Sequence, residues 1–167
     1  IQADLSQLPP VLGNLIEDDE FKKELSLIKN VEGTAVGKLV IGEDTRDINV
    51  RVMASDIHLK ADYQRIPYPV IITTGNLHLD GSRMTLTNID ANVGKSSLTQ
   101  LSSKFGWEKA SLLELSSKSA KVDLAQLHEW LMQHKAIEKD LKNFRAVNGT
   151  VTLQNANLSG PLFKPDR

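Results

Sequence analysis

The chain has 167 residues, of which 20 are basic and 21 acidic, so its formal net charge is -1. This balance argues against a nucleic-acid-binding surface, which would need clustered positive charge to neutralise phosphates. The sequence contains no cysteine, which excludes disulfide bonds and cysteine-based metal sites. Its length predicts a single domain that can bury a hydrophobic core without such cross-links.

The ends of the sequence suggest a piece of a longer chain. The first residue is Ile1 rather than Met, and the sequence ends at Arg167 just after a strand-like segment. No segment approaches the ~18 consecutive apolar residues of a membrane-spanning helix. No basic start followed by an apolar core marks a signal peptide. We therefore expect a fragment whose targeting sequence lies outside it.

Residues 1–30 have the pattern of an amphipathic helical segment in two pieces. Pro9 and Pro10 can open a helix, because the first turn does not need their missing N–H groups. Phe21, Leu25 and Ile28 recur at helical spacing in the second piece. The acidic residues 18–20 before this piece are typical of the start of a solvated helix, although a ligand or metal patch is the alternative.

Residues 31–122 are expected to form an antiparallel β-sheet. From Ile71 to Leu79 the side chains alternate between the two faces, as in a strand with one buried face. Leu86 and Ile89 continue the apolar face on opposite parity, so we predict a β-bulge near Thr87–Asn88. Similar changes of parity occur in residues 47–59, 98–105 and 110–122. The fold class is therefore mainly β with flanking helices (α+β), a long twisted meander that forms a curved sheet or groove.

Residues 123–147 are expected to form a helix. Asp123 is the predicted N-cap, and Gln126 completes a pattern typical of a capping box. The apolar stripe of this helix is Leu124, Leu127, Leu131, Ile137, Leu141 and Phe144. Residues 148–167 are expected to start a following β unit. The sequence Val-x-Gly-Thr occurs at both 31–34 and 147–150, after a Leu-rich helix each time, which suggests a repeated unit.

No group of residues predicts an enzyme. Nothing in the pattern brings two carboxylates together for acid/base catalysis. The histidines fall on polar strand faces or at a helix spacing that does not share a face. We therefore predict no catalytic residue, no metal site and no cofactor, and a hydrolase with an unrecognised carboxylate pair remains the enzymatic alternative. The residues considered are Asp56, Asp62, Asp80, Asp90, His58, His78, His128 and His134.

The apolar face of the sheet is the remaining candidate for a functional site. If part of it stays uncovered, it can line a groove for long alkyl chains, which need a continuous apolar surface and few polar contacts. The competing interpretation is a closed β-sandwich that buries this face in its core. The residues predicted to line the groove are Ile71, Leu77, Leu79, Met84, Leu86, Ile89 and Val93.

The order of these segments resembles a known family. The sequence PYPVIITTGNLHLDGSRMTLTNIDANVGKSSLTQLSSKFGW, followed by a Ser/Leu-rich strand and by DLAQLHEWL, is similar to AsmA-like (AsmA/TamB-related) proteins of Gram-negative envelopes. The flanking segments VEGTAVGKLVIG and AVNGTVTLQNANLSGPLFKP resemble recurring units of the same family. The resemblance covers most of the chain, and its motifs contain no invariant reactive group.

This resemblance implies a periplasmic protein anchored to the inner membrane through a segment outside this sequence. It implies a long curved sheet with a hydrophobic groove, and a role in phospholipid transport and outer-membrane biogenesis. The expected partners are a phospholipid or another acyl-chain lipid and, in addition, envelope proteins, with no nucleic acid. The alternative function is a closed β-sandwich adaptor or scaffold that binds a protein partner in the envelope.

Overall fold

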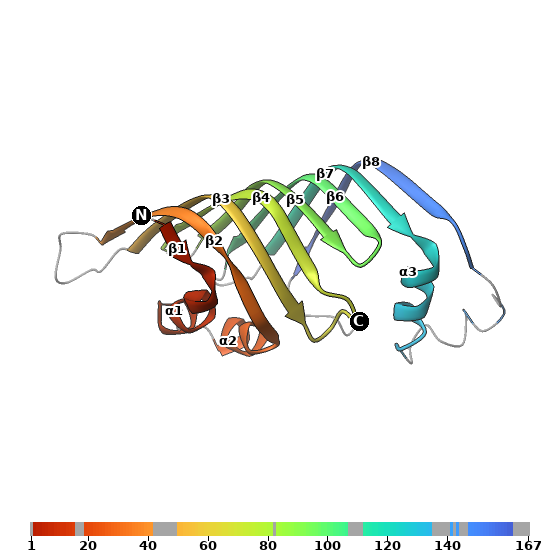
Figure 1. Cartoon of the computed structure of the whole chain (residues 1–167), viewed down its shortest axis with the longest axis horizontal. Coiled ribbons are helices and arrows are strands. Elements are labelled where there is room, and N and C mark those ends of the chain that lie inside the picture. Colours follow the sequence, from red (N-terminus) through yellow and green to blue (C-terminus); the bar gives the residue numbers. More distant parts are fainter. Residues whose placement is uncertain are drawn as a thin grey trace.

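A single antiparallel sheet forms most of the structure. The computed structural model describes residues 2–15, 19–41, 50–81, 83–106, 112–134, 141, 143 and 147–161. In this part of the chain each strand pairs with the next one in sequence, which confirms the predicted meander and its open, curved form (Figure 1). The strands are β1 (Gln2–Asp4), β2 (Ile28–Ile41), β3 (Val50–Tyr63), β4 (Val70–Asp80), β5 (Arg83–Val93), β6 (Ser96–Gly106), β7 (Leu112–Asp123) and β8 (Thr150–Pro161).

Short helices lie at the two ends of this sheet. The 3-10 helix η1 (Leu5–Gln7), α1 (Leu8–Leu15) and α2 (Asp19–Ser26) connect β1 to β2, and α3 (Leu124–Leu131) follows β7. Figure 1 shows α1 and α2 beneath the arch of the sheet near β1 and β2, with α3 at the opposite end. The helices therefore leave the other face of the described sheet uncovered.

The prediction of an entirely helical segment over residues 1–30 is wrong at both of its ends. Gln2–Asp4 form β1, which pairs with β2 from Thr34 to Val36. Ile28, expected on the second helix, is the first residue of β2 and pairs with Tyr63. In both places pairing with a distant strand overrides the local helical pattern. The two helices predicted between these strands are present as α1 and α2.

The predicted bulges are confirmed and lie near one another across the sheet. Asn88 has a φ of 53°, and the register of β5 with β6 shifts between Leu86 and Ile89. Gln100 in β6 has a φ of 48°, and Asn155 in β8 has a φ of 53°. The flanking pairs show that the bulges at Gln100 and Asn155 lie at the same height, because Ser117 and Ser119 of β7 pair with the residues on either side of each one. Because the strands change parity at a similar height, most of their apolar side chains remain on one face.

We call this face the inner face, and it holds the core. Helical residues Leu5, Leu12 and Phe21 pack against strand side chains that come from β2 to β6. Residues directly opposite each other on paired strands share a face, so the register extends the inner face to β8. The strand residues buried in this cluster are Ala35, Ile57, Leu77, Leu79 and Phe105.

The predicted N-cap of α3 is confirmed, whereas the predicted length of the helix is not. The Asp123 carboxylate accepts a hydrogen bond from the Gln126 backbone N–H at 2.9 Å. The Gln126 side chain does not complete a capping box, because its Oε1 accepts from the Lys95 backbone N–H at 2.6 Å. The α3 helix ends at Leu131, where the N–H of His134 turns back to the Leu131 carbonyl. Most of the predicted remainder lies outside the described residues.

Candidate functional site

The seven residues predicted to line an apolar groove do not share one environment. Ile71 lies on the outer face, where it pairs with Lys60 and Asn92 and is 39% exposed. The prediction that Ile71 and Leu77 share a face is wrong, because register shifts between Ile72 and Asn76 reverse which face the side chains of β4 point to. Ile72 takes the inner position instead and packs against the core.

The other six predicted residues lie on the inner face, but most of them are covered. Leu77, Leu79 and Ile89 are buried, with Leu79 only 2% exposed. Met84 and Leu86 are half-buried and pack against the core cluster. Val93 stands apart from these residues and lines a pocket under α3, described below.

The α2 helix is one of the elements that cover this part of the inner face. The Phe21 ring stacks on the Phe105 ring of β6, with ring centroids 5.9 Å apart and planes inclined by 26°. Both rings are buried. Aromatic pairs of this kind stabilise by about 0.5–1.5 kcal/mol beyond their area burial. The stacking therefore fixes α2 across the sheet as far as β6.

A polar cluster holds the C-terminal half of α2 to the sheet. Glu24 accepts a hydrogen bond from the Tyr63 hydroxyl at 2.7 Å and forms a two-pronged ion pair with the Arg65 guanidinium. Burial alone raises the pKa of Glu24, but the hydrogen bonds from Arg65 and Tyr63 more than offset this effect, so the pKa is lowered. Burial and the neighbouring Glu24 carboxylate raise the pKa of Tyr63 to about 12. The cluster therefore favours an ionised Glu24 and a neutral Tyr63.

Arg65 also connects the loop between β3 and β4 to α3. Its backbone carbonyl accepts a hydrogen bond from the Trp130 indole N–H at 2.8 Å. Three residues further on, the Tyr68 hydroxyl donates to the Glu129 carboxylate at 2.8 Å, which raises the pKa of Tyr68. The loop is thus attached to α2 by the Arg65 side chain and to α3 by two hydrogen bonds.

The inner face is open along β8. Leu158 is 65% exposed and Leu153 is 48% exposed, although both lie on the face that is buried in the centre of the sheet. Their partners on β7 are Leu115 and Ala120. We call this surface the open strip, and it consists of the exposed Val151, Leu153 and Leu158 of β8 with the half-buried Leu115 and Val122 of β7, while Ala120 is buried beneath it.

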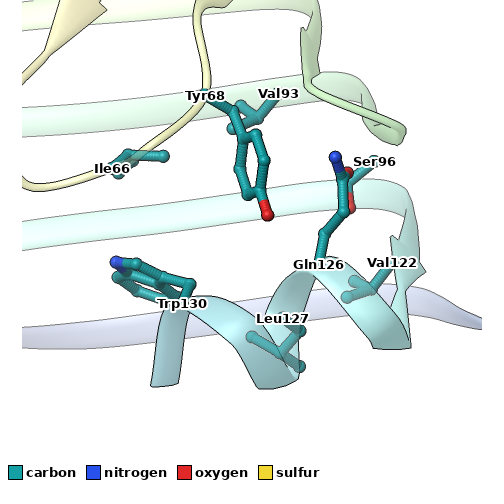
Figure 2. Close-up of a pocket in the computed structure, with 8 residues that line it drawn as sticks. All are labelled: Ile66, Tyr68, Val93, Ser96, Val122, Gln126, Leu127 and Trp130. Carbon is teal, nitrogen blue, oxygen red and sulfur yellow. The ribbon is translucent and has the colours of Figure 1, made fainter. Parts of the chain in front are cut away.

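A pocket of about 150 Å³ lies between α3 and the end of the inner face (Figure 2). The strands and the loop before β4 contribute one side of the pocket, and Figure 2 shows the Tyr68 ring standing between Val93 and α3. The residues of this side are Ile66, Tyr68, Val93, Ser96 and Val122. The α3 side is formed by Gln126, Leu127 and Trp130.

The polar groups around this pocket are directed to other parts of the protein. The Trp130 indole N–H and the Tyr68 hydroxyl donate to Arg65 and Glu129, as described above. The Ser96 hydroxyl oxygen accepts from the Asp123 backbone N–H at 3.0 Å. Because these groups are already paired, the pocket offers a ligand mainly ring faces and aliphatic carbons, with the Gln126 side-chain amide as its other polar group.

The polar residues considered for catalysis are dispersed. Asp62 accepts a hydrogen bond from Asn30, Asp80 pairs with Arg51 at 3.2 Å, and Asp90 accepts from the Gln100 backbone N–H. Asp90 thereby supports the bulge at Gln100. Among the described residues, no three histidine or acidic side chains gather as a metal site. The enzymatic and non-enzymatic interpretations both stay predictions.

Sequence reasoning identified Val93 but missed the pocket as a whole. Ile66 and Tyr68 lie in a loop, and Trp130 lies on a helix whose position over the sheet cannot be deduced from periodicity. No helix in the part of the chain that the structure describes combines the length and apolar character needed to cross a membrane. Comparison of the chain with protein-family models, curated protein sequences and solved structures finds no match.

Proposed function

We propose that the chain is a segment of a periplasmic AsmA-like protein that binds phospholipid acyl chains on the open strip. In this proposal the protein is anchored to the inner membrane by a segment outside this sequence, is not an enzyme, and takes part in phospholipid transport for outer-membrane biogenesis. The sequence resemblance described above supports the family and the location. The open strip supports the ligand.

The exposure of Leu158 carries the proposal for the ligand. A leucine that is 65% exposed on the face that holds the core leaves apolar surface in water. From Leu158 to Val151 the strip extends over seven residue steps, or about 23 Å at ~3.3 Å per residue. One leaflet of the ~30 Å hydrocarbon core of a bilayer is about 15 Å thick. The strip is therefore long enough to lie along an acyl chain.

Charged substitutions on the two faces of the sheet test this proposal. We expect Leu153→Lys and Leu158→Lys to weaken acyl-chain binding about tenfold or more, because each removes ~1.5–3 kcal/mol of side-chain burial against the ligand. Both side chains are exposed, so the free energy of unfolding should change by less than about 0.5 kcal/mol. The matched control is Val36→Lys on the outer face, where Val36 is 49% exposed.

Binding is measured with a fluorescent fatty acid and with native mass spectrometry of the purified domain. The proposal requires the two β8 variants to lose binding and Val36→Lys to retain it. Equal binding by all three variants, or no uptake of the fatty acid by the unmodified protein, would contradict it.

A protein partner that pairs with β8 is the second candidate function. In the described sheet β8 pairs with β7 alone, and it has no charged residue and no proline before its last residue, Pro161. Exposed edge strands usually carry such residues, because they prevent pairing with another chain. The open sheet departs from the closed β-sandwich of this alternative, so the partner is expected at the strand edge. Gln154→Lys with Asn157→Lys should abolish such an association, measured by sedimentation, and leave fatty-acid binding intact.

A further inference from the structure

We infer that the pocket beneath α3 receives the methyl end of one acyl chain, whose remaining length lies on the open strip. This inference rests on the proposed function and adds the orientation of the bound acyl chain. The chain end is enclosed by α3, and the headgroup lies toward Leu158.

The size of the pocket matches the end of an alkyl chain. Its volume is about 150 Å³. An apolar cavity of this volume in another protein accommodates benzene, so about six carbon atoms fit. A whole acyl chain of a phospholipid is longer than this, and its remainder must lie outside the pocket. The pocket therefore suits a chain end and excludes a complete lipid.

Strand pairing connects the pocket to the open strip. Val122 lines the pocket and pairs directly with Val151 on β8. Leu153 and Leu158 follow on the same inner face of β8, further from α3. An acyl chain can thus leave the pocket beside Val122 and continue along β8 over Leu153 and Leu158, with Ala156 between them.

The chemistry of the pocket selects the methyl end over the headgroup. The hydroxyl of Tyr68 is bonded to Glu129, and the indole N–H of Trp130 is bonded to the Arg65 carbonyl. A carboxylate or phosphate placed there would lose its hydration without gaining these donors, which is costly for a charged group. A methyl end loses nothing and buries apolar surface.

Trp130 provides the measurement, because its ring lines the pocket. In a Trp107→Phe background Trp130 is the sole tryptophan, since the chain has two. We expect stearic acids brominated near the methyl end to quench its fluorescence more strongly than acids brominated near the carboxyl group. Val93→Phe should abolish this difference by filling the pocket. Each methylene of the fatty acid that this variant keeps out of the pocket should weaken binding about fourfold. A buried methylene contributes ~0.8 kcal/mol, and about 1.4 kcal/mol is a tenfold change in the dissociation constant.

The controls separate this inference from the proposed function. Ile71→Phe adds the same ring on the outer face and should leave quenching unchanged. Leu127→Phe fills the pocket from α3 and replaces Val93→Phe if that variant does not fold. Binding of the fatty acid in native mass spectra with quenching that does not depend on bromine position overturns the pocket inference alone. Absence of any bound fatty acid overturns both proposals.

Discussion

The contact between Gly75 and Ile89 gives the sharpest test of how the inner face is packed. A Cβ atom at position 75 would lie 2.1 Å from Cδ1 and 3.3 Å from Cγ1 of Ile89, whose side chain is buried. Gly75→Ala therefore forces Ile89 to move within a packed core, which costs about 1–3 kcal/mol. Reduced entropy of the unfolded chain offsets about 0.5–1 kcal/mol. We expect a net loss of about 1–2 kcal/mol.

A second substitution turns this expectation into a measurement of coupling. Ile89→Val removes Cδ1 and on its own should cost about 1 kcal/mol. In the double variant the overlapping atom is absent, so alanine at position 75 is tolerated. We expect the double variant to be more stable than Gly75→Ala alone, with a coupling free energy of about 1–2 kcal/mol.

Urea unfolding followed by circular dichroism measures the stability of the unmodified protein, the two single variants and the double variant. The control is Gly160→Ala, because a Cβ atom at Gly160 on β8 would have no neighbour within 4 Å. Its effect should add to that of Ile89→Val within about 0.5 kcal/mol. Additive effects for Gly75 and Ile89 would refute the packing derived from the bulge in β4, and so would a Gly75→Ala variant that is more stable than the unmodified protein.

Substitutions at three further positions, with their controls, test the helices that cover the sheet. Phe21→Ala should lower the free energy of unfolding by about 3 kcal/mol, whereas Phe21→Leu should cost less than about 1.5 kcal/mol and the exposed Val11→Ala less than about 0.5 kcal/mol. A loss below about 1 kcal/mol for Phe21→Ala would contradict the stacking on β6. The lowered pKa of Glu24 predicts stability that is present above its ordinary value of 4.5 and is lost as the pH falls through the folded-state pKa. Urea unfolding should be measured between pH 3 and pH 6, on the order of one unit either side of that value. The free energy of unfolding of Glu24→Gln should depend less on pH than that of the unmodified protein. An unchanged pH dependence would mean that other carboxylates cause it. Asp123→Ala should loosen α3 at a cost of about 1 kcal/mol, with Asp123→Asn as the conservative control, and a Trp130 emission spectrum identical in both variants would count against this cap.

The sequence allowed the sheet and its bulges to be predicted because their signal is local. A change of parity between Leu86 and Ile89 requires an extra residue, and the structure has a positive φ at Asn88 between them. The bulge in β4 gave no such signal. Ile71 and Ile72 are both apolar, so either could face inward, and the choice depends on pairing with β3 and β5.

The distribution of covered and open surface could not be predicted from the sequence. Periodicity shows that β4 and β8 each have an apolar face, but it does not show which of these faces a helix covers. Phe21 reaches Phe105 across 84 positions of sequence, and Leu79 is buried in the same cluster, whereas Leu158 remains exposed. Six of the seven predicted residues therefore lie on the inner face, most of them in its covered part.

The loop at Arg65 explains why the covered and open parts can coexist on one curved sheet. Its side chain binds Glu24 of α2, and its backbone carbonyl binds Trp130 of α3. The two helices therefore meet at one loop near the end of β3, although they follow different strands. From this point α2 extends over the inner face toward β6, and α3 covers the end of the inner face beside Val93 and Val122. Neither helix packs over Leu158, because α2 reaches only as far as β6 and α3 lies at the other end of β7 and β8, beside Val122. The exposure of Leu158 thus follows from where the two helices lie on the sheet.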